Sequence, residues 1–199
     1  MKKLSLLLIS FIFISKVAYS STYNSDPEIF IKELVSDSIN KLSDKNTSEE
    51  DKKKFIESIA IENVDINALG LYTLGELRKS TDKNNLENYQ QAFQKYFLKS
   101  LTSRLTDYSS NKFEIIDAEK KSSNYTIVRS KIIANDNQPE IKIDWRIYTK
   151  NPDKPLIRDL IVEGLSLART QKEEFSSILN SNNNDINILI IKLDEFVKN

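Results

Sequence analysis

Two arginines and two carboxylates are the side chains of this sequence whose types and spacing best suit chemistry. Asp159 and Glu163 lie four residues apart, and Arg129 and Arg146 lie in two earlier segments of alternating apolar residues. If these segments are neighbouring antiparallel strands, the opposite charges can pair and hold the strands in register. Alternatively, either guanidinium can bind a phosphate group, because its planar fork matches two phosphate oxygens. Pairing within the sheet is the interpretation we prefer.

The amino-acid composition argues against catalysis. The sequence contains no histidine and no cysteine, and only three glycines. Zinc or copper sites built on imidazole or thiolate are therefore excluded, as are Ser-His and Cys-His nucleophilic systems. No P-loop, dinucleotide-binding glycine motif or nucleophile elbow is present. A hydrolase with paired carboxylates is the remaining enzymatic alternative, but no pair stands out. We expect no catalytic residues, no metal and no cofactor.

The first twenty residues are expected to be a cleaved signal peptide. Lys2 and Lys3 precede the apolar stretch 4–14, and Ala18-Tyr19-Ser20 supplies small residues for cleavage before Ser21. The apolar stretch is too short to span a bilayer, which needs about 20 residues. The domain expected in 21–199 has a helical part over about 26–109, a sheet over about 112–166 and C-terminal helices over about 168–198.

The charge balance also restricts the partners. The sequence has 29 basic and 29 acidic residues, and removal of the signal peptide removes three of the lysines. A nucleic-acid partner would require a concentrated positive patch. Near-neutrality likewise argues against lasting attachment to anionic lipid surfaces. We therefore expect an exported protein that does not bind nucleic acid.

Helical periodicity dominates the first half of the sequence. Asp26-Pro27 is a good helix start, and Thr47 or Ser48 is expected to begin a second helix. A short third helix is expected over 68–77. A long fourth helix follows, with an aromatic-rich face. That face contains Leu86, Tyr89, Phe93, Tyr96, Phe97, Leu101, Leu105 and Tyr108.

After residue 111 the period changes from 3.6 to 2, which predicts strands over 113–118, 125–134, 141–148 and 156–162. Ile141, Ile143, Trp145 and Ile147 alternate with polar residues, as in a strand with one buried face. Two further helices are expected over about 170–179 and 185–197. The predicted fold class is α+β: a twisted antiparallel sheet of about four strands packed against N-terminal and C-terminal helices, with an apolar cavity between the layers.

Several segments of the sequence form a recognisable set. The most specific is Arg158-Asp159-Leu160-Ile161-Val162-Glu163-Gly164-Leu165-Ser166-Leu167. Others are Val64-Asp65 before Leu74-Gly75, Ala92-Phe93-x-x-Tyr96-Phe97, Ile127-Val128-Arg129-Ser130-Lys131-Ile132 and Ile143-Asp144-Trp145-Arg146-Ile147. Together these segments resemble the MlaC, or toluene-tolerance, family of periplasmic phospholipid-binding proteins. The resemblance extends over nearly all of residues 21–199.

The resemblance implies a soluble, monomeric carrier that shuttles phospholipid across the periplasm and maintains outer-membrane lipid asymmetry. The implied partners are phospholipid, an inner-membrane ABC transporter complex with its substrate-binding subunit, and an outer-membrane lipoprotein–porin complex. Such a carrier must cover its cargo, because an acyl chain of about sixteen methylenes costs roughly 13 kcal/mol to expose to water. We therefore expect an apolar, deformable pocket.

The predicted sheet and the long helix supply the pocket candidates. They are Phe93, Phe97, Leu101, Leu105, Tyr108, Val128, Ile132, Ile141, Ile143, Trp145, Ile147, Leu160, Val162 and Leu165. Arg129 and Arg146 are candidates for headgroup contact or for strand register. Each apolar residue could instead simply fill the core. Two other functions stay open: a binding module for another apolar ligand, such as a fatty acid or lipoprotein acyl group, and an adaptor whose groove binds a protein partner.

Overall fold

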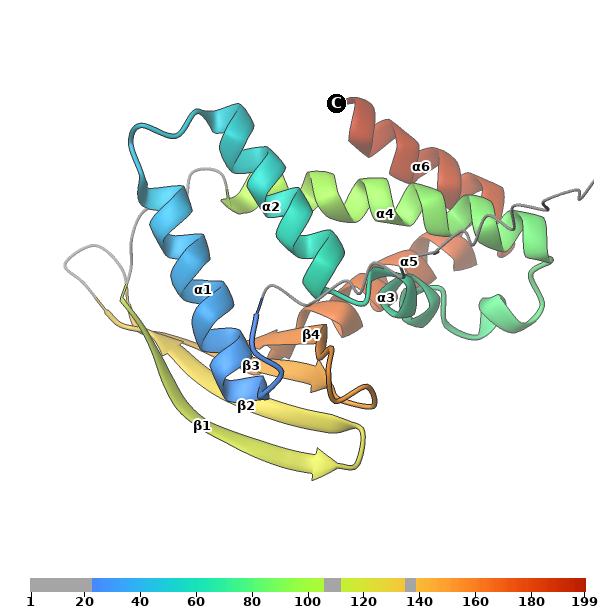
Figure 1. The fold of residues 1–199 in the computed structure, drawn as a ribbon. Coiled ribbons are helices and arrows are strands. Elements are labelled where there is room, and N and C mark those ends of the chain that lie inside the picture. Colours follow the sequence, from blue (N-terminus) through green and yellow to red (C-terminus); the bar gives the residue numbers. More distant parts are fainter. Residues whose placement is uncertain (1–22, 106–111, 135–138) are drawn as a thin grey trace, which may run out of the picture.

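The computed structural model describes residues 23–105, 112–134 and 139–199 (Figure 1). Over these residues the chain forms six α-helices, one 3-10 helix and a five-stranded antiparallel sheet. The helices are α1 (Pro27–Ser43), α2 (Glu49–Asn63), α3 (Ile66–Thr73), the 3-10 helix η1 (Gly75–Lys79), α4 (Lys83–Leu105), α5 (Leu167–Asn180) and α6 (Ile186–Lys198). The strands are β1 (Phe113–Ser122), β2 (Tyr125–Ile132), β3 (Ile141–Tyr148), β4 (Leu156–Val162) and β5 (Leu165–Ser166).

Short polar residues begin most of these helices. At α1 the carboxylate of Asp26 accepts hydrogen bonds from the backbone N–H groups of Glu28 and Ile29, at 3.0 and 3.1 Å. Pro27 follows at the first helical position, where it removes no intrahelical hydrogen bond. The helices α2, α3, α4, α5 and α6 also have side-chain caps, from Ser48, Asp65, Asp82, Ser166 and Asp185.

The sheet runs in sequence order from β1 to β5, and each strand is antiparallel to the next. Val128 lies opposite Trp145, which in turn lies opposite Leu160. These residues belong to the inner face of the sheet, which packs against α1. The alternate positions, among them Arg146 opposite Asp159, form the outer face. The alternation on β3 therefore separates an apolar face from a polar one, as the sequence predicts.

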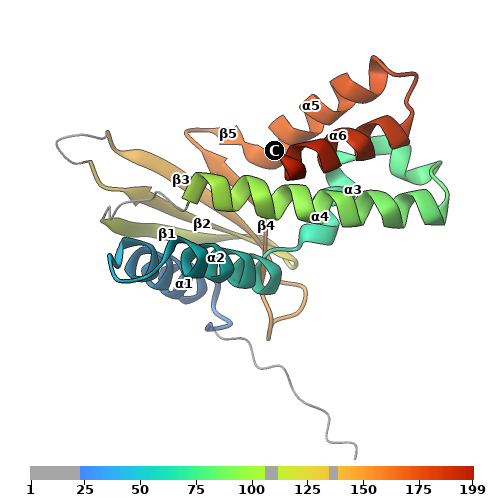
Figure 2. The ribbon, with the colours of Figure 1, turned by 90° about the horizontal axis from the view of Figure 1, so that it is seen from above.

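The helices divide into two groups (Figures 1 and 2). α1 lies along the inner face of the sheet, whereas α4 packs against α2, α3 and α6, and α5 packs against α3 and α6. The two groups join at β4. There Val64 forms a parallel bridge with Ile157, and the N–H of Asp65 donates to the carbonyl of Ile157 at 2.9 Å.

The predicted α+β architecture is confirmed, whereas the apolar cavity between the layers stays a prediction and several boundaries were wrong. β1 continues to Ser122 because Ser123 and Asn124 form a two-residue turn into β2. A short fifth strand follows Glu163 and Gly164, whose positive φ angles of 49° and 82° suit a tight hairpin. Because β5 occupies residues 165 and 166, α5 begins at residue 167. Separately, α3 ends at residue 73, earlier than expected. Among the described residues, none of the helices combines the length and apolarity needed to cross a membrane.

Candidate functional site

The buried apolar side chains form two clusters. The helix cluster joins α3, α4, α5 and α6 around Tyr89, Phe93 and Phe175. The sheet cluster joins α1 to the inner face of the sheet around Phe30 and Trp145. A domain of this size usually has one continuous core. Here the half-buried Val64 packs against both clusters. The candidate binding residues are therefore those near the boundary between the helices and the sheet.

The environment of α4 changes along its length. In its first half Tyr89 and Phe93 are buried in the helix cluster. In its last turns Leu101 and Leu105 are only half-buried, and within the described residues they belong to neither cluster. Phe97 lies between these extremes: it is half-buried and packs against the helix cluster. The C-terminal end of α4 therefore carries apolar side chains that the rest of the described protein does not fully cover.

The position of Phe93 has a steric cause. A β-carbon at Gly70 of α3 would lie 2.9 Å from Cδ1 of the Phe93 ring, closer than side chains normally approach. The glycine therefore lets the ring sit directly against α3. Phe93 also contacts Phe175 edge-to-face, with the ring centroids 6.2 Å apart. The structure thus places Phe93 within the helix cluster, between α3, α4 and α5.

The inner face of the sheet shows a similar change from buried to half-buried. Val128, Trp145 and Ile147 are buried in the sheet cluster. The half-buried positions form what we call the apolar strip: Ile132, Ile141, Ile143, Leu160 and Val162. The strip is continuous, because Ile132 pairs with Ile141 and Ile143 pairs with Val162. Its members therefore share the end of the sheet where β2 ends and β3 begins.

The end of α4 and the apolar strip lie toward the same end of the molecule. Figures 1 and 2 both place the C-terminal end of α4 toward the end of the sheet at which β2 stops and β3 starts. Leu165, just after the strip, is 68% exposed. Tyr108, another pocket candidate, lies outside the described residues. This region therefore gathers half-buried apolar side chains from a helix and from a sheet.

The buried polar groups below the strip are satisfied within the sheet. The hydroxyl of Ser130 donates to the carbonyl of Ile143 at 2.9 Å and accepts from the indole Nε1 of Trp145 at 2.9 Å. No buried side-chain N or O atom among the described residues lacks a hydrogen-bond partner. The surface of the inner face is therefore hydrocarbon, and its polar groups are hydrogen-bonded within the protein.

The candidate arginines lie on the outer face. Arg146 contacts Asp159 at 3.6 Å, which agrees with the expected pairing across strands. The expected partner of Arg129 was wrong: Arg129 binds Asp117 and Glu119 of β1, at 2.7 and 2.6 Å. The cause is the register of β1, which places Asp117 opposite Arg129, and its length, which adds Glu119 to the strand. The hydrogen bonds that Arg129 donates to Glu119 and Asp117 raise the pKa of its guanidinium above the ordinary value.

Asp159 and Glu163 have different roles. Asp159 is buried, and its carboxylate accepts hydrogen bonds from the hydroxyl of Ser166 at 2.6 Å and the N–H of Ala168 at 3.0 Å. It therefore fixes the start of α5 against β4. Glu163 instead accepts a hydrogen bond from the backbone N–H of Lys142 at 2.5 Å. This element of the sequence thus has a structural role at the sheet edge and the helix start.

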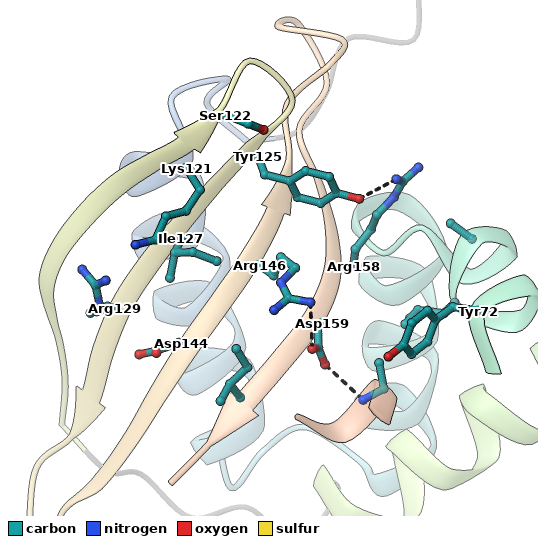
Figure 3. A pocket seen from close by; sticks show the side chains of 14 residues that line it. Tyr72, Lys121, Ser122, Tyr125, Ile127, Arg129, Asp144, Arg146, Arg158 and Asp159 are labelled. Atoms are coloured by element: carbon teal, nitrogen blue, oxygen red, sulfur yellow. Dashed lines mark hydrogen bonds and ion pairs between the residues drawn. The ribbon is translucent and has the colours of Figure 1, made fainter. Parts of the chain in front are cut away.

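A pocket of about 750 Å³ opens on the outer face of the sheet, beside α3 (Figure 3). We call it the outer pocket. Its lining residues are Ala68, Leu69, Tyr72, Lys121, Ser122, Tyr125, Ile127, Arg129, Asp144, Arg146, Arg158, Asp159, Ile161 and Ala168. The sequence did not predict this pocket, because alternating polar residues on a strand normally indicate a solvent-exposed face. Tyr125 and Ile127, which interrupt the polar side of β2, were the available signal.

Fold and site together define an α+β protein in which a sheet and a helical layer face each other across half-buried apolar side chains. The chain belongs to the MlaC family, because the family model described as MlaC protein matches residues 32–195. The resemblance seen in the sequence is thereby confirmed.

Among solved structures, the chain is similar to the phospholipid-binding protein from Ralstonia solanacearum, determined in complex with a phospholipid. The TM-score is 0.69 and the identity 17%, and the match covers 84% of this chain and 94% of that chain. At this identity the match shows a shared fold. No curated protein matches the sequence.

Proposed function

We propose that this protein is a phospholipid carrier that holds acyl chains between the apolar strip and the C-terminal end of α4. The supporting observation is that Leu101, Leu105 and the strip are apolar and only half-buried, and that the end of α4 and the strip lie toward the same end of the molecule. The Ralstonia solanacearum protein of the same fold was determined with a phospholipid bound. Membership of the MlaC family points the same way.

The chemistry of the strip suits acyl chains. Its members are all branched aliphatic residues, which contact a lipid tail without requiring hydrogen bonds. Each methylene withdrawn from water contributes about 0.8 kcal/mol to the free energy of binding, so a long, unbranched ligand binds the strip most strongly. Because the paired groups of Ser130 and Trp145 are already satisfied, nothing on this face demands a particular headgroup. Binding of this kind is strong but unselective, as a carrier requires.

The cellular setting follows from the family and the sequence. The MlaC family is periplasmic. We propose that residues 1–20 are a signal peptide cleaved before Ser21, and that residues 21–199 form a monomeric, non-enzymatic domain. In this proposal the domain exchanges phospholipid with an inner-membrane ABC transporter complex, through its substrate-binding subunit. It also exchanges phospholipid with an outer-membrane lipoprotein–porin complex, and so helps to maintain lipid asymmetry.

A second candidate function is carriage of a different apolar ligand, such as a fatty acid or a lipoprotein acyl group. The apolar strip favours hydrocarbon but carries no group that distinguishes one tail from two. A protein adaptor is less favoured. An adaptor has no lipid in its core, so the apolar side chains of α4 would be covered by other protein side chains up to the end of the helix. Leu101 and Leu105 are half-buried instead.

Mass spectrometry of an organic extract tests the proposal. The full chain is expressed with its own N-terminus in a bacterial host, purified from the periplasmic fraction without detergent, and extracted with chloroform and methanol. We expect intact diacyl phospholipids, and an N-terminus at Ser21 by protein mass. Extracts that contain only single-chain lipids would favour the second candidate. An extract free of lipid, from folded protein, would overturn both.

A further inference from the structure

The outer pocket contains six charged side chains, most of which the protein already pairs. Arg129 and Lys121 share Glu119, each at 2.6 Å. Arg158 binds Asp65 at 2.6 Å. The remaining three are Arg146, Asp144 and Asp159. The carboxylate of Asp159 faces the start of α5 and is satisfied there by its two hydrogen bonds.

Arg146 and Asp144 are the two charges that remain available. Among the residues that the structure describes, Arg146 has a single charged partner, Asp159, at the long distance of 3.6 Å, and its side chain is 46% exposed. Asp144 makes no hydrogen bond or ion pair within the described parts of the chain, and it does not pair with Arg146. Both stand on the outer face of β3, two residues apart, so their Cα atoms lie about 6.6 Å from each other. The pocket therefore presents a positive and a negative charge side by side.

The rest of the pocket provides hydroxyl donors and apolar surface. The hydroxyl of Tyr125 accepts a hydrogen bond from Nη1 of Arg158 at 2.8 Å, which leaves its own proton free to be donated. Figure 3 shows Tyr125 and Tyr72 on the α3 side of the pocket, with Arg146 between them and Asp144. Ile127 and Ile161 contribute apolar surface beside these groups.

We propose that the outer pocket binds a small zwitterion of the phosphoethanolamine type. The phosphate ester binds the guanidinium of Arg146, whose fork matches two phosphate oxygens, and receives the proton of the Tyr125 hydroxyl. The primary ammonium group binds the carboxylate of Asp144. The spacing of the two side chains favours a ligand whose charges are separated by a short carbon chain. An α-amino acid, which carries both charges on one carbon, fits this spacing less well.

The same chemistry has two sources: a free aminoalkyl phosphate, or the headgroup of a phospholipid in a membrane surface. The outer pocket lies on the face of the sheet opposite the apolar strip, so this inference does not depend on the proposed function. A ligand there would leave the inner face unobstructed.

Calorimetric titration of the full mature chain with O-phosphoethanolamine tests the soluble source. We expect it to bind about tenfold or more tightly than inorganic phosphate or ethanolamine alone, since each of these satisfies one charge only. Arg146→Gln and Asp144→Asn should each lower the affinity by about tenfold. The matched variants Arg169→Gln on α5 and Asp153→Asn in the turn before β4 should leave the affinity unchanged. Circular dichroism confirms that each variant is folded.

Vesicle flotation tests the membrane source. Vesicles that contain phosphatidylethanolamine are compared with vesicles of phosphatidylcholine alone, whose quaternary ammonium cannot donate a hydrogen bond to Asp144. Binding that requires phosphatidylethanolamine, and that Arg146→Gln and Asp144→Asn abolish, would support the pocket with a membrane lipid as its ligand. Unchanged or tighter binding of O-phosphoethanolamine by Asp144→Asn would overturn the proposal and indicate a simple anion site. Failure of the wild-type chain to bind either probe would also overturn it.

Discussion

Arg158 of β4 and Asp65 at the start of α3 form an ion pair that joins the sheet to the helical layer. Nε and Nη2 of Arg158 lie 2.8 and 2.6 Å from the same carboxylate oxygen, Oδ2 of Asp65. That carboxylate also caps α3 by accepting the N–H of Ala68 at 3.1 Å. The guanidinium carbon of Arg158 lies 3.4 Å from the ring centroid of Tyr148 on β3. One arginine thus connects two strands to a helix terminus.

Arg158→Lys should destabilise the protein. A lysine has no planar guanidinium, so it cannot reproduce both contacts to Oδ2 of Asp65 or the stacking on Tyr148, and the pair is only partly exposed. We expect the free energy of unfolding in urea to fall by about 1–3 kcal/mol. The matched change Arg169→Lys, at an exposed pair with Glu173, should cost less than about 0.5 kcal/mol. Equal losses of unfolding free energy in the two variants would contradict a structural role for the ion pair between Arg158 and Asp65.

Gly70→Ala should also destabilise the protein, against the usual preference of helices for alanine. In an exposed helix the change stabilises by about 1 kcal/mol. At this position the added carbon would meet the Phe93 ring at 2.9 Å. We expect a net loss of about 1–3 kcal/mol in urea unfolding. Phe93→Leu, which removes the ring, should partly restore the stability of Gly70→Ala. Additive losses in the double variant would show that the ring is not the cause.

The stability of the protein should fall at high pH because of Tyr23. Burial, together with the negative charge of Asp37, raises the pKa of Tyr23 to about 12. In the unfolded chain the phenol ionises near pH 10. The contribution of Tyr23 to stability is therefore complete below pH 10 and is lost as the pH rises from 10 to 12.

Urea unfolding at a series of pH values from 9 to 12 measures this loss. Tyr23→Phe keeps the ring contact with Phe30 but removes the ionisable group, so it should flatten the pH dependence. Burial also raises the pKa of Tyr89, so some pH dependence should persist in this variant. Tyr72→Phe, at an exposed ring, serves as the control. An unchanged slope in Tyr23→Phe would contradict the assignment.

The helix starts and the strand faces could be predicted from the sequence because they depend on local chemistry. Asp26-Pro27 and Ser48 cap helices wherever those helices pack. The alternation of Ile143 and Trp145 with polar residues fixes which side of β3 is buried. Such signals depend only on the spacing of neighbouring residues, and they gave the correct fold class.

The partners of individual side chains could not be predicted, because they depend on distant segments. Phe93 meets α3 since Gly70, 23 residues earlier in the sequence, provides the room. Arg129 binds Asp117 because the register of β1 against β2 places the two opposite each other, and it binds Glu119 because β1 extends four residues further than its apolar pattern indicates. The outer pocket needs Tyr72 of α3 beside Arg146 of β3, and no pattern within either segment encodes that approach.

Ile143→Trp is expected to displace the lipid while leaving the protein folded. Ile143 is only half-buried in the apolar strip, so part of an indole there can remain outside the packed core. Val128, in contrast, is completely buried, and a tryptophan there would unfold the sheet cluster. Overpacking of a binding site costs about 1–3 kcal/mol, so co-purified phospholipid should fall by about tenfold. Mass spectrometry of organic extracts, normalised to protein, measures the change.

Ile116→Trp is the matched control for this experiment. Ile116 lies on β1 and is 52% exposed, so the same substitution there adds an indole outside the strip. Its phospholipid content should equal that of the wild-type chain. Circular dichroism and urea unfolding show whether either variant has lost its fold. If folded Ile143→Trp carries as much phospholipid as Ile116→Trp, the acyl chains lie elsewhere, because an indole in the strip would occupy the volume that they need.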